Sequence, residues 1–130
     1  MASPNLLTIF NNHFSEFLED VHNIFPDDVD VLTAKNSLNM MRKMNPRLLV
    51  SIWSSLVVQP YKTQIENGDI SFFIQKDYTQ DFSQNENAGK IMEAIDRLRG
   101  PVSEMTPSDQ QKTMKYIQNL SKLAVAYENK

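Results

Sequence analysis

Histidine is the side chain that most often moves protons or binds metals near neutral pH, and this chain has two, His13 and His22. They lie nine residues apart, so on one helix they point to opposite sides and cannot hold one metal ion together. His13 and Glu16 have an i, i+3 spacing, but helical di-iron sites need several such pairs from several helices. We therefore expect solvated or hydrogen-bonded histidines, with no metal and no other cofactor.

The acidic run at residues 27–30, with the sequence Asp-Asp-Val-Asp, has the composition of a cation site. A calcium-binding loop needs acids at alternate positions, then a glycine and a distant glutamate. Here a valine, a leucine and a threonine follow, and the glycine is missing. The run therefore indicates a helix N-terminus, where carboxylates meet the positive end of the helix dipole.

Motifs for nucleotide binding and acyl transfer are missing. Three glycines spread over 130 residues leave no Gly-rich phosphate loop, and no G-x-S-x-G elbow occurs. We therefore expect that the chain is not an enzyme. An enzyme with a dispersed carboxylate or tyrosine site is an alternative, which a buried pocket holding such side chains with shifted pKa values would favour.

Arg42, Lys43 and Arg47 form a basic cluster across the predicted break between the second and third helices. A helix–turn–helix DNA reader would place the third helix in a groove, but that helix carries leucine, isoleucine, tryptophan and small serines. The formal net charge of −3 is also contrary to a nucleic-acid-binding domain. Regulation on nucleic acid through these three residues is the alternative function. Otherwise these three side chains are solvated or contact an acid-rich surface.

The charges of the chain are sorted by position. Residues 1–30 carry six acids and no lysine or arginine, residues 31–65 carry five bases and no acid, and residues 66–130 mix ten acids with eight bases. Opposite charges of this kind can pair within one fold, pair between copies or steer a partner. We expect the acidic first helix to meet the basic corner between the second and third helices, in the same or a neighbouring copy.

Large aromatic residues are the remaining candidates for a binding surface. Trp53 and Tyr61 are of the types enriched at interface hot spots, although core packing is the favoured reading for Trp53. Four aromatic residues crowd the segment 72–82, where core packing is again favoured. The alternative is that Phe72 or Phe82 lies off the inner face and belongs to an exposed patch.

The positions of proline, glycine and capping residues predict an all-α fold for one domain spanning residues 1–130. The first helix is expected from Ser3-Pro4 to Pro26. The second should begin at Asp28 or Asp30, with Met44 as a further candidate for the inner face of that helix. The third should run from Asn45-Pro46 to a break or kink at Pro60. The third helix should be central, because a wide apolar face around Trp53 is backed by small serines that allow close approach from a second side.

The second half of the chain continues the helical pattern. We expect a short helix Tyr61–Asn67 ending at Gly68, an element capped by Asp69, a loop Thr79–Asn87, a helix broken by Gly100-Pro101, and a last helix opened by Thr106-Pro107. The run Ile70–Ile74 also fits a short buried strand, but a helix is favoured because no second strand is present to pair with it. The whole should be a compact bundle of five to six helices.

Cysteine is absent, which suits a reducing intracellular compartment such as a cytoplasm. The longest apolar runs are far shorter than the roughly 18 residues that a membrane span needs, so we expect no membrane insertion. We also expect no signal peptide, because no basic stretch followed by an apolar run opens the chain.

Several stretches resemble small, functionally uncharacterised proteins encoded by large DNA viruses that infect algae and protists. They are Asn45–Trp53, Pro60-Tyr61, Gly68–Phe73, Lys76–Tyr78 and Met114–Leu123. The resemblance implies a late-expressed protein that enters the virus particle, for example as a minor capsid component in the host cytoplasm. It brings no catalytic residues with it.

Together these features predict a non-catalytic structural or interaction protein. It would act by packing helix faces, with protein partners or by self-association, and would use Arg42, Lys43, Arg47, Trp53, Tyr61, Phe72 and Phe82.

Overall fold

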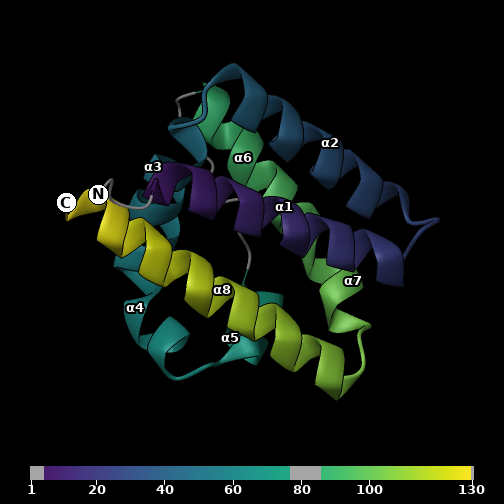
Figure 1. Cartoon of the computed structure of the whole chain (residues 1–130). Coiled ribbons are helices and arrows are strands. Elements are labelled where there is room, and N and C mark those ends of the chain that lie inside the picture. Colours follow the sequence, from purple (N-terminus) through teal and green to yellow (C-terminus); the bar gives the residue numbers. More distant parts are fainter. Residues whose placement is uncertain (1–4, 77–85, 130) are drawn as a thin grey trace.

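Helices dominate the computed structural model, which describes residues 5–76 and 86–129 (Figure 1). In chain order the elements are α1 (Leu6–Ile24), α2 (Val29–Met44), α3 (Leu48–Trp53), the π-helical turn η1 (Ser54–Val58), α4 (Gln59–Glu66), α5 (Ile70–Gln75), α6 (Glu86–Arg97), α7 (Arg99–Ser103) and α8 (Pro107–Glu128). These residues contain no strand, so the predicted all-α fold is confirmed. The ambiguous run Ile70–Ile74 lies in α5 and is helical.

Three helices begin at predicted capping side chains. The side-chain oxygens of Asp28, Asp69 and Thr106 each accept the backbone N–H three residues ahead, at 3.1 to 3.2 Å. Each bond satisfies an amide that the helix itself leaves without an acceptor. Gly68 follows the end of α4 with a positive φ of 67°, a conformation that favours glycine and confirms the predicted stop.

Two helix starts differ from the prediction. Asn5 caps α1, whose first residue is Leu6, whereas the predicted start at Ser3-Pro4 lies outside the described residues. Asn45-Pro46 forms a turn in place of a cap, because the Asn45 side chain accepts the N–H of Arg47 at 3.2 Å. The helix α3 therefore starts two residues after the proline, with no side-chain cap.

Pro60 bends one long helical rod, α3–η1–α4, without ending it. Because proline has no N–H to donate, the hydrogen-bond ladder must change near it. The N–H of Gln59 bonds to the carbonyl of Ser54, five residues back, which is the register of a π-helix. Tyr61 then leaves the helical conformation, with φ −122° and ψ 26°. The predicted kink is therefore present, spread over residues 54–61.

Gly100-Pro101 does not break a helix as predicted. The helix α6 already ends at Arg97, and Gly100-Pro101 lies inside the short helix α7. Proline fits there because it sits in the first turn, where its missing N–H would have had no partner. The predicted loop Thr79–Asn87 overlaps α6 at its last two residues, and its earlier part lies outside the described residues.

The helices enclose one core, with α1 between α2 and α8 and antiparallel to both (Figure 1). The helix α2 also packs on α6, and α3 contacts α1, α2, α6 and α8, which confirms the predicted central position of α3. The largest fully buried side chains include Phe10, Phe14, Leu38, Leu49 and Leu120. With the bent rod α3–η1–α4 and the pair α6–α7 each taken as one, six helical units make up the described chain, as predicted.

Candidate functional site

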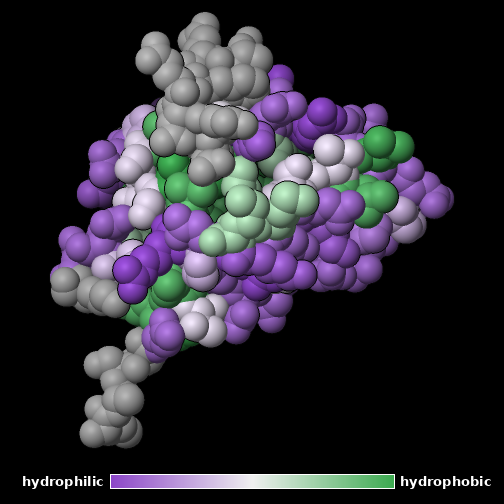
Figure 2. Space-filling model, turned by 90° about the horizontal axis from the view of Figure 1, so that it is seen from above, coloured by the Kyte–Doolittle hydropathy of each residue, from purple (hydrophilic) through white to green (hydrophobic). Residues whose placement is uncertain are grey.

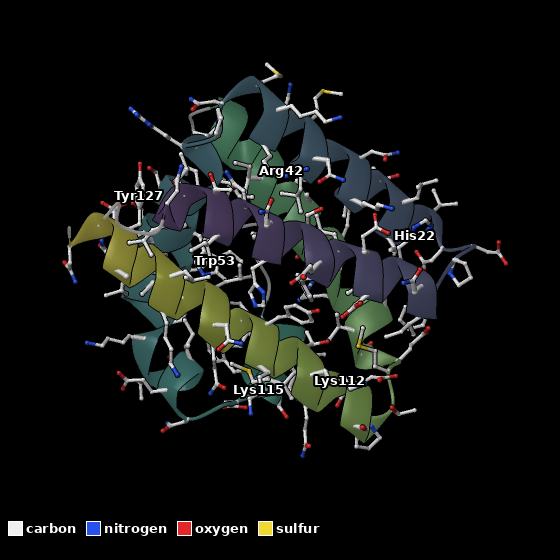
Figure 3. All side chains as sticks on the ribbon, viewed as in Figure 1. His22, Arg42, Trp53, Lys112, Lys115 and Tyr127 are labelled. Atoms are coloured by element: carbon white, nitrogen blue, oxygen red, sulfur yellow. The ribbon has the colours of Figure 1, made fainter. Side chains whose placement is uncertain are left out.

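Trp53 lies in the core and is only 4% exposed (Figure 3). Its indole N–H donates to the Ser121 hydroxyl at 3.1 Å, and its ring meets Phe14 edge-on at a centroid distance of 5.4 Å. Ser121 is also buried and donates in turn to the carbonyl of Ile117 at 2.7 Å. Trp53 therefore joins α3 to α1 and α8, which is the core role that the sequence favoured for it.

Tyr61 and Phe72 come together in an aromatic cluster with Phe73. The ring centroids of Tyr61 and Phe72 are 5.3 Å apart, and those of Phe72 and Phe73 are 5.2 Å apart. The Lys76 ammonium lies 4.9 Å from the centre of the Tyr61 ring, within the range of a cation–π contact. Phe72 is half-buried, so the cluster presents only part of its surface to solvent. Phe82 lies outside the described residues.

Several acids of the first thirty residues pair with basic side chains of the same chain. Glu19 pairs with Lys35 at 2.7 Å, and Asp30 pairs with Arg97 at 3.0 Å. The Lys35 hydrogen bond and positive charge lower the pKa of the Glu19 carboxyl. His22 also accepts from Lys35, at 3.1 Å, so this histidine is hydrogen-bonded as expected.

Arg42, Lys43 and Arg47 stand together at the junction of α2 and α3, and none makes an ion pair within the described residues. Arg42 is half-buried, and one guanidinium nitrogen, Nη2, lies 3.5 Å from the Asn39 side-chain oxygen. Its Nε is buried without an acceptor. Lys43 and Arg47 are exposed. This basic corner therefore keeps positive charge that the acids of its own first helix do not neutralise.

The outer face of α2 carries exposed apolar side chains at both of its ends, and Met40 and Met44 lie next to that corner. Val29, Leu32, Met40 and Met44 are 44% to 74% exposed. Figure 2 looks onto this side of the molecule from above and shows apolar atoms interrupting a hydrophilic surface. Met44, a candidate inner-face residue in the sequence, thus points to solvent. We call Val29, Leu32, Met40 and Met44 the outer face of α2.

His13 and Tyr116 form the strongest candidate for catalysis among the described residues. Their ring centroids lie 4.9 Å apart with the planes tilted by 40°, His13 Nδ1 lies 3.3 Å from a Glu16 oxygen, and the Tyr116 hydroxyl donates to Asp20. Burial, and then the hydrogen bond to Asp20, raise the pKa of the Tyr116 hydroxyl. A raised pKa holds the phenolic proton in place, whereas a tyrosine that attacks or takes a proton needs a lowered one. The arrangement fits a bond between α8 and α1.

Metal ligands do not gather in the part of the chain that the structure describes, where no three His, Cys, Asp or Glu side chains could hold one ion. No described helix combines the length and the apolar content needed to cross a bilayer.

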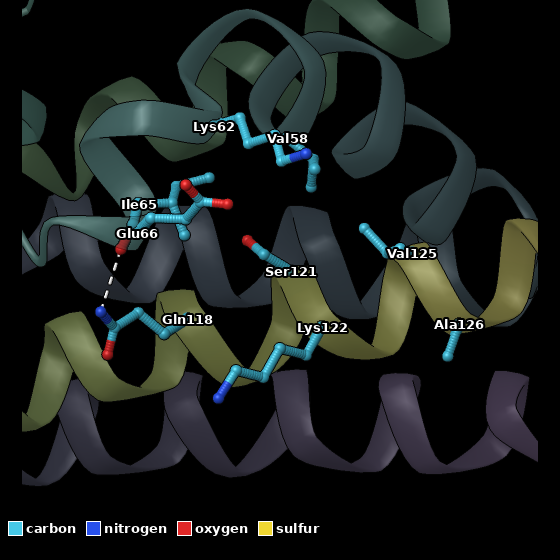
Figure 4. Close-up of a pocket in the computed structure, with 9 residues that line it drawn as sticks. All are labelled: Val58, Lys62, Ile65, Glu66, Gln118, Ser121, Lys122, Val125 and Ala126. Atoms are coloured by element: carbon cyan, nitrogen blue, oxygen red, sulfur yellow. Dashed lines mark hydrogen bonds between the residues drawn. The ribbon is translucent and has the colours of Figure 1, made fainter.

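A groove between the bent rod and α8 is the site that the sequence did not reveal (Figure 4). Its volume is about 530 Å³, and its apolar lining comes from Val58, Ile65, Val125 and Ala126. The two walls lie some sixty residues apart in the chain. No motif in the sequence singles out the residues of either wall.

The comparisons add no relative to this description. Neither known protein-family models, nor curated proteins, nor solved structures give a match to this chain.

Proposed function

We propose that this protein is non-catalytic and acts by binding another protein along the outer face of α2. The observation that carries the proposal is the concentration of exposed apolar groups there. Of the seven large hydrophobic side chains exposed in the described chain, four belong to α2. Such clusters mark interaction surfaces in soluble proteins. Met40 and Met44 add flexible, polarizable side chains that adapt well to a partner.

The charges at the end of α2 define the chemistry of the partner. Lys43 and Arg47 are exposed, and Arg42 has a guanidinium that its own chain satisfies poorly. As cations in the last turn of α2, Arg42 and Lys43 also stabilise that helix through its dipole, and that role leaves their outer donors available. The partner should therefore present acidic side chains beside apolar ones.

A different protein fits this surface better than a second copy of the same chain. Two of the carboxylates that a second copy could offer, those of Glu19 and Asp30, are already paired with Lys35 and Arg97. The free energy lost by breaking those ion pairs would offset much of the free energy that ion pairs between two copies contribute. Self-association through the acidic first helix is therefore the less favoured form of the proposal.

The resemblance to proteins of large DNA viruses supports a virus particle as the setting of this interaction, with the chain as a minor capsid-associated component. Mass spectrometry of purified particles from the native source tests that part of the proposal. Recovery of the chain only from the cell fraction would contradict it.

The interaction itself is tested by recovering the protein from its native source as wild type, as the double variant Met40→Glu/Met44→Glu and as Ile9→Glu. Ile9 is a matched control because it is an exposed apolar residue on α1. The partner should be lost with the double variant and kept with Ile9→Glu, while circular dichroism shows both folded. Retention of the partner by the double variant would contradict the proposal. Release by nuclease, together with a steep salt dependence, would favour the nucleic-acid alternative through Arg42, Lys43 and Arg47.

A further inference from the structure

The groove between α4 and α8 has the size and lining of a small-molecule site. Its volume of about 530 Å³ falls within the range of roughly 300 to 1,000 Å³ that ligand pockets occupy. From its lining and charges we propose that it binds a single-chain carboxylate amphiphile of the fatty-acid type. The alkyl chain would lie along the groove, and the carboxylate would sit at its rim.

Two polar side chains in the wall of the groove, Gln118 and Ser121, already make hydrogen bonds within the protein. The Gln118 amide nitrogen donates to the Ile65 carbonyl at 2.9 Å, which ties α8 to α4 across one end of the groove (Figure 4). The Ser121 hydroxyl accepts from Trp53 and donates to the Ile117 carbonyl. A ligand body with polar groups would find few partners in this wall and would lose hydrogen bonds to water on entry. The body of the ligand should therefore be apolar.

The rim carries the charges that would hold the head of the ligand. Lys62 comes from the α4 wall, and Lys122 comes from α8, from which its side chain extends away from the α4 wall (Figure 4). Neither lysine makes an ion pair in the described chain. Glu66 is the single carboxylate among the lining residues, so these residues together carry one net positive charge. An anionic head is therefore favoured over a cationic one.

The bend at Pro60 shapes this wall. The π-helical register adds a residue to the turn before the proline, and both Val57 and Val58 are buried as a result. Val58 lines the groove one turn before Lys62, so an apolar contact and a positive rim charge come from neighbouring turns of the same rod.

The test uses the full chain and N-phenyl-1-naphthylamine, a neutral fluorescent probe of apolar sites. Dodecanoate and dodecyltrimethylammonium, which share a chain length and differ in charge, compete with the probe below their micelle concentrations. We expect dodecanoate to displace the probe and to bind more tightly than the cation. Equal affinity of the two amphiphiles would overturn the proposal, because the rim charges would then play no part.

Charge variants at the rim should change the affinity for dodecanoate in opposite directions. Lys62→Gln should weaken dodecanoate binding about two- to fivefold, the size expected for one exposed charge pair, and Glu66→Gln should strengthen it by a similar factor. Lys112→Gln is the matched control, since Lys112 is an exposed lysine on α8 that does not line this groove, and it should leave the affinity unchanged. The same affinity for Lys62→Gln and wild type would overturn the assignment of the head to this rim.

Filling the groove tests where the alkyl chain lies. The Val125 side chain points into the groove and is partly exposed, so Val125→Trp should block binding without disturbing the core (Figure 4). The two charge variants change exposed residues and stay informative if Val125→Trp loses its fold. Full dodecanoate binding by a folded Val125→Trp would overturn the proposal. So would light scattering that shows a wild-type dimer which Val125→Trp converts to monomer, because a second copy would then occupy the groove.

Discussion

Replacing Ser121 with alanine tests whether the interior around Trp53 is sealed from water. The Ser121 hydroxyl is the acceptor for the indole N–H of Trp53, at 3.1 Å, and both side chains are buried. In Ser121→Ala the N–H stays buried and loses its acceptor, which costs about 1–3 kcal/mol of unfolding free energy. The bond from Ser121 to the Ile117 carbonyl contributes little to that figure, because a serine that bonds back to its own helix does not stabilise it.

Urea unfolding measures this loss directly. For a slope of about 2 kcal/mol/M, a loss of 1–3 kcal/mol lowers the midpoint by about 0.5 to 1.5 M. Trp53 is the single tryptophan of the chain, so its fluorescence reports on this site while circular dichroism reports on all the helices. Ser55→Ala is the control, because Ser55 is an exposed serine of η1 and its change should stay within about 0.5 kcal/mol.

A loss below about 0.5 kcal/mol in Ser121→Ala would refute the reasoning. Ser121 also lines the groove between α4 and α8, so the small loss would mean that water enters from the groove and replaces the hydroxyl. A loss of about 1–3 kcal/mol in unfolding free energy, in contrast, requires that water cannot reach the indole N–H of Trp53, even though Ser121 lines the groove.

Three further predictions concern local contacts. Burial raises the pKa of Tyr116, so the stability that this tyrosine contributes is present below the pKa of a free tyrosine, about 10, and is lost as the pH rises above that value. Tyr116→Phe should therefore flatten the fall in unfolding free energy between pH 9 and 11. Equal slopes for the variant and the wild type would contradict this prediction. Gly68→Ala should cost about 1–2 kcal/mol in urea unfolding because φ is 67° there, whereas Gly100→Ala, with open space at its Cβ inside α7, should be neutral or stabilising by up to about 1 kcal/mol. Thr106→Ala should cost about 1 kcal/mol by removing the cap of α8, and an unchanged midpoint would show that the cap is replaced by water.

Local signals explain why so much of the fold was predictable from the sequence. Asp28, Asp69 and Thr106 each cap a helix through an amide three residues ahead, so the evidence for each start is contained in four residues. Gly68 stops α4 for an equally local reason, its positive φ. These signals survive folding because nothing distant competes with them.

The incorrect predictions occurred where two local solutions compete. Asn45-Pro46 can serve as a cap followed by a first helical residue or as a turn, and the Asn45 contact with the Arg47 N–H selects the turn. Gly100-Pro101 can break a helix or begin one, and the end of α6 before the glycine allows a new start. A single sequence does not contain the packing energy that decides between such alternatives.

The candidate sites depended even more on tertiary structure. Sorted charges predicted that acidic and basic segments would attract, but not that Glu19 would pair with Lys35 and Asp30 with Arg97. The groove is lined by residues within 58–66 and 118–126, and no pattern within either segment predicts that it packs beside the other.

The lining residues separate the two binding surfaces. Met40 and Met44 of the outer face of α2 line a hollow of about 380 Å³ together with charged residues of α6, among them Glu93 and Arg97, so a partner there must offer polar groups beside apolar ones. The groove between α4 and α8 is concave and can enclose a slender apolar molecule on its own, which is the condition for small-ligand binding. The two surfaces share no residue, so Met40→Glu/Met44→Glu should leave dodecanoate binding intact and Lys62→Gln should leave the protein partner bound. Loss of both activities in either variant would show that the surfaces are coupled through the core, and the separate assignment would then be wrong.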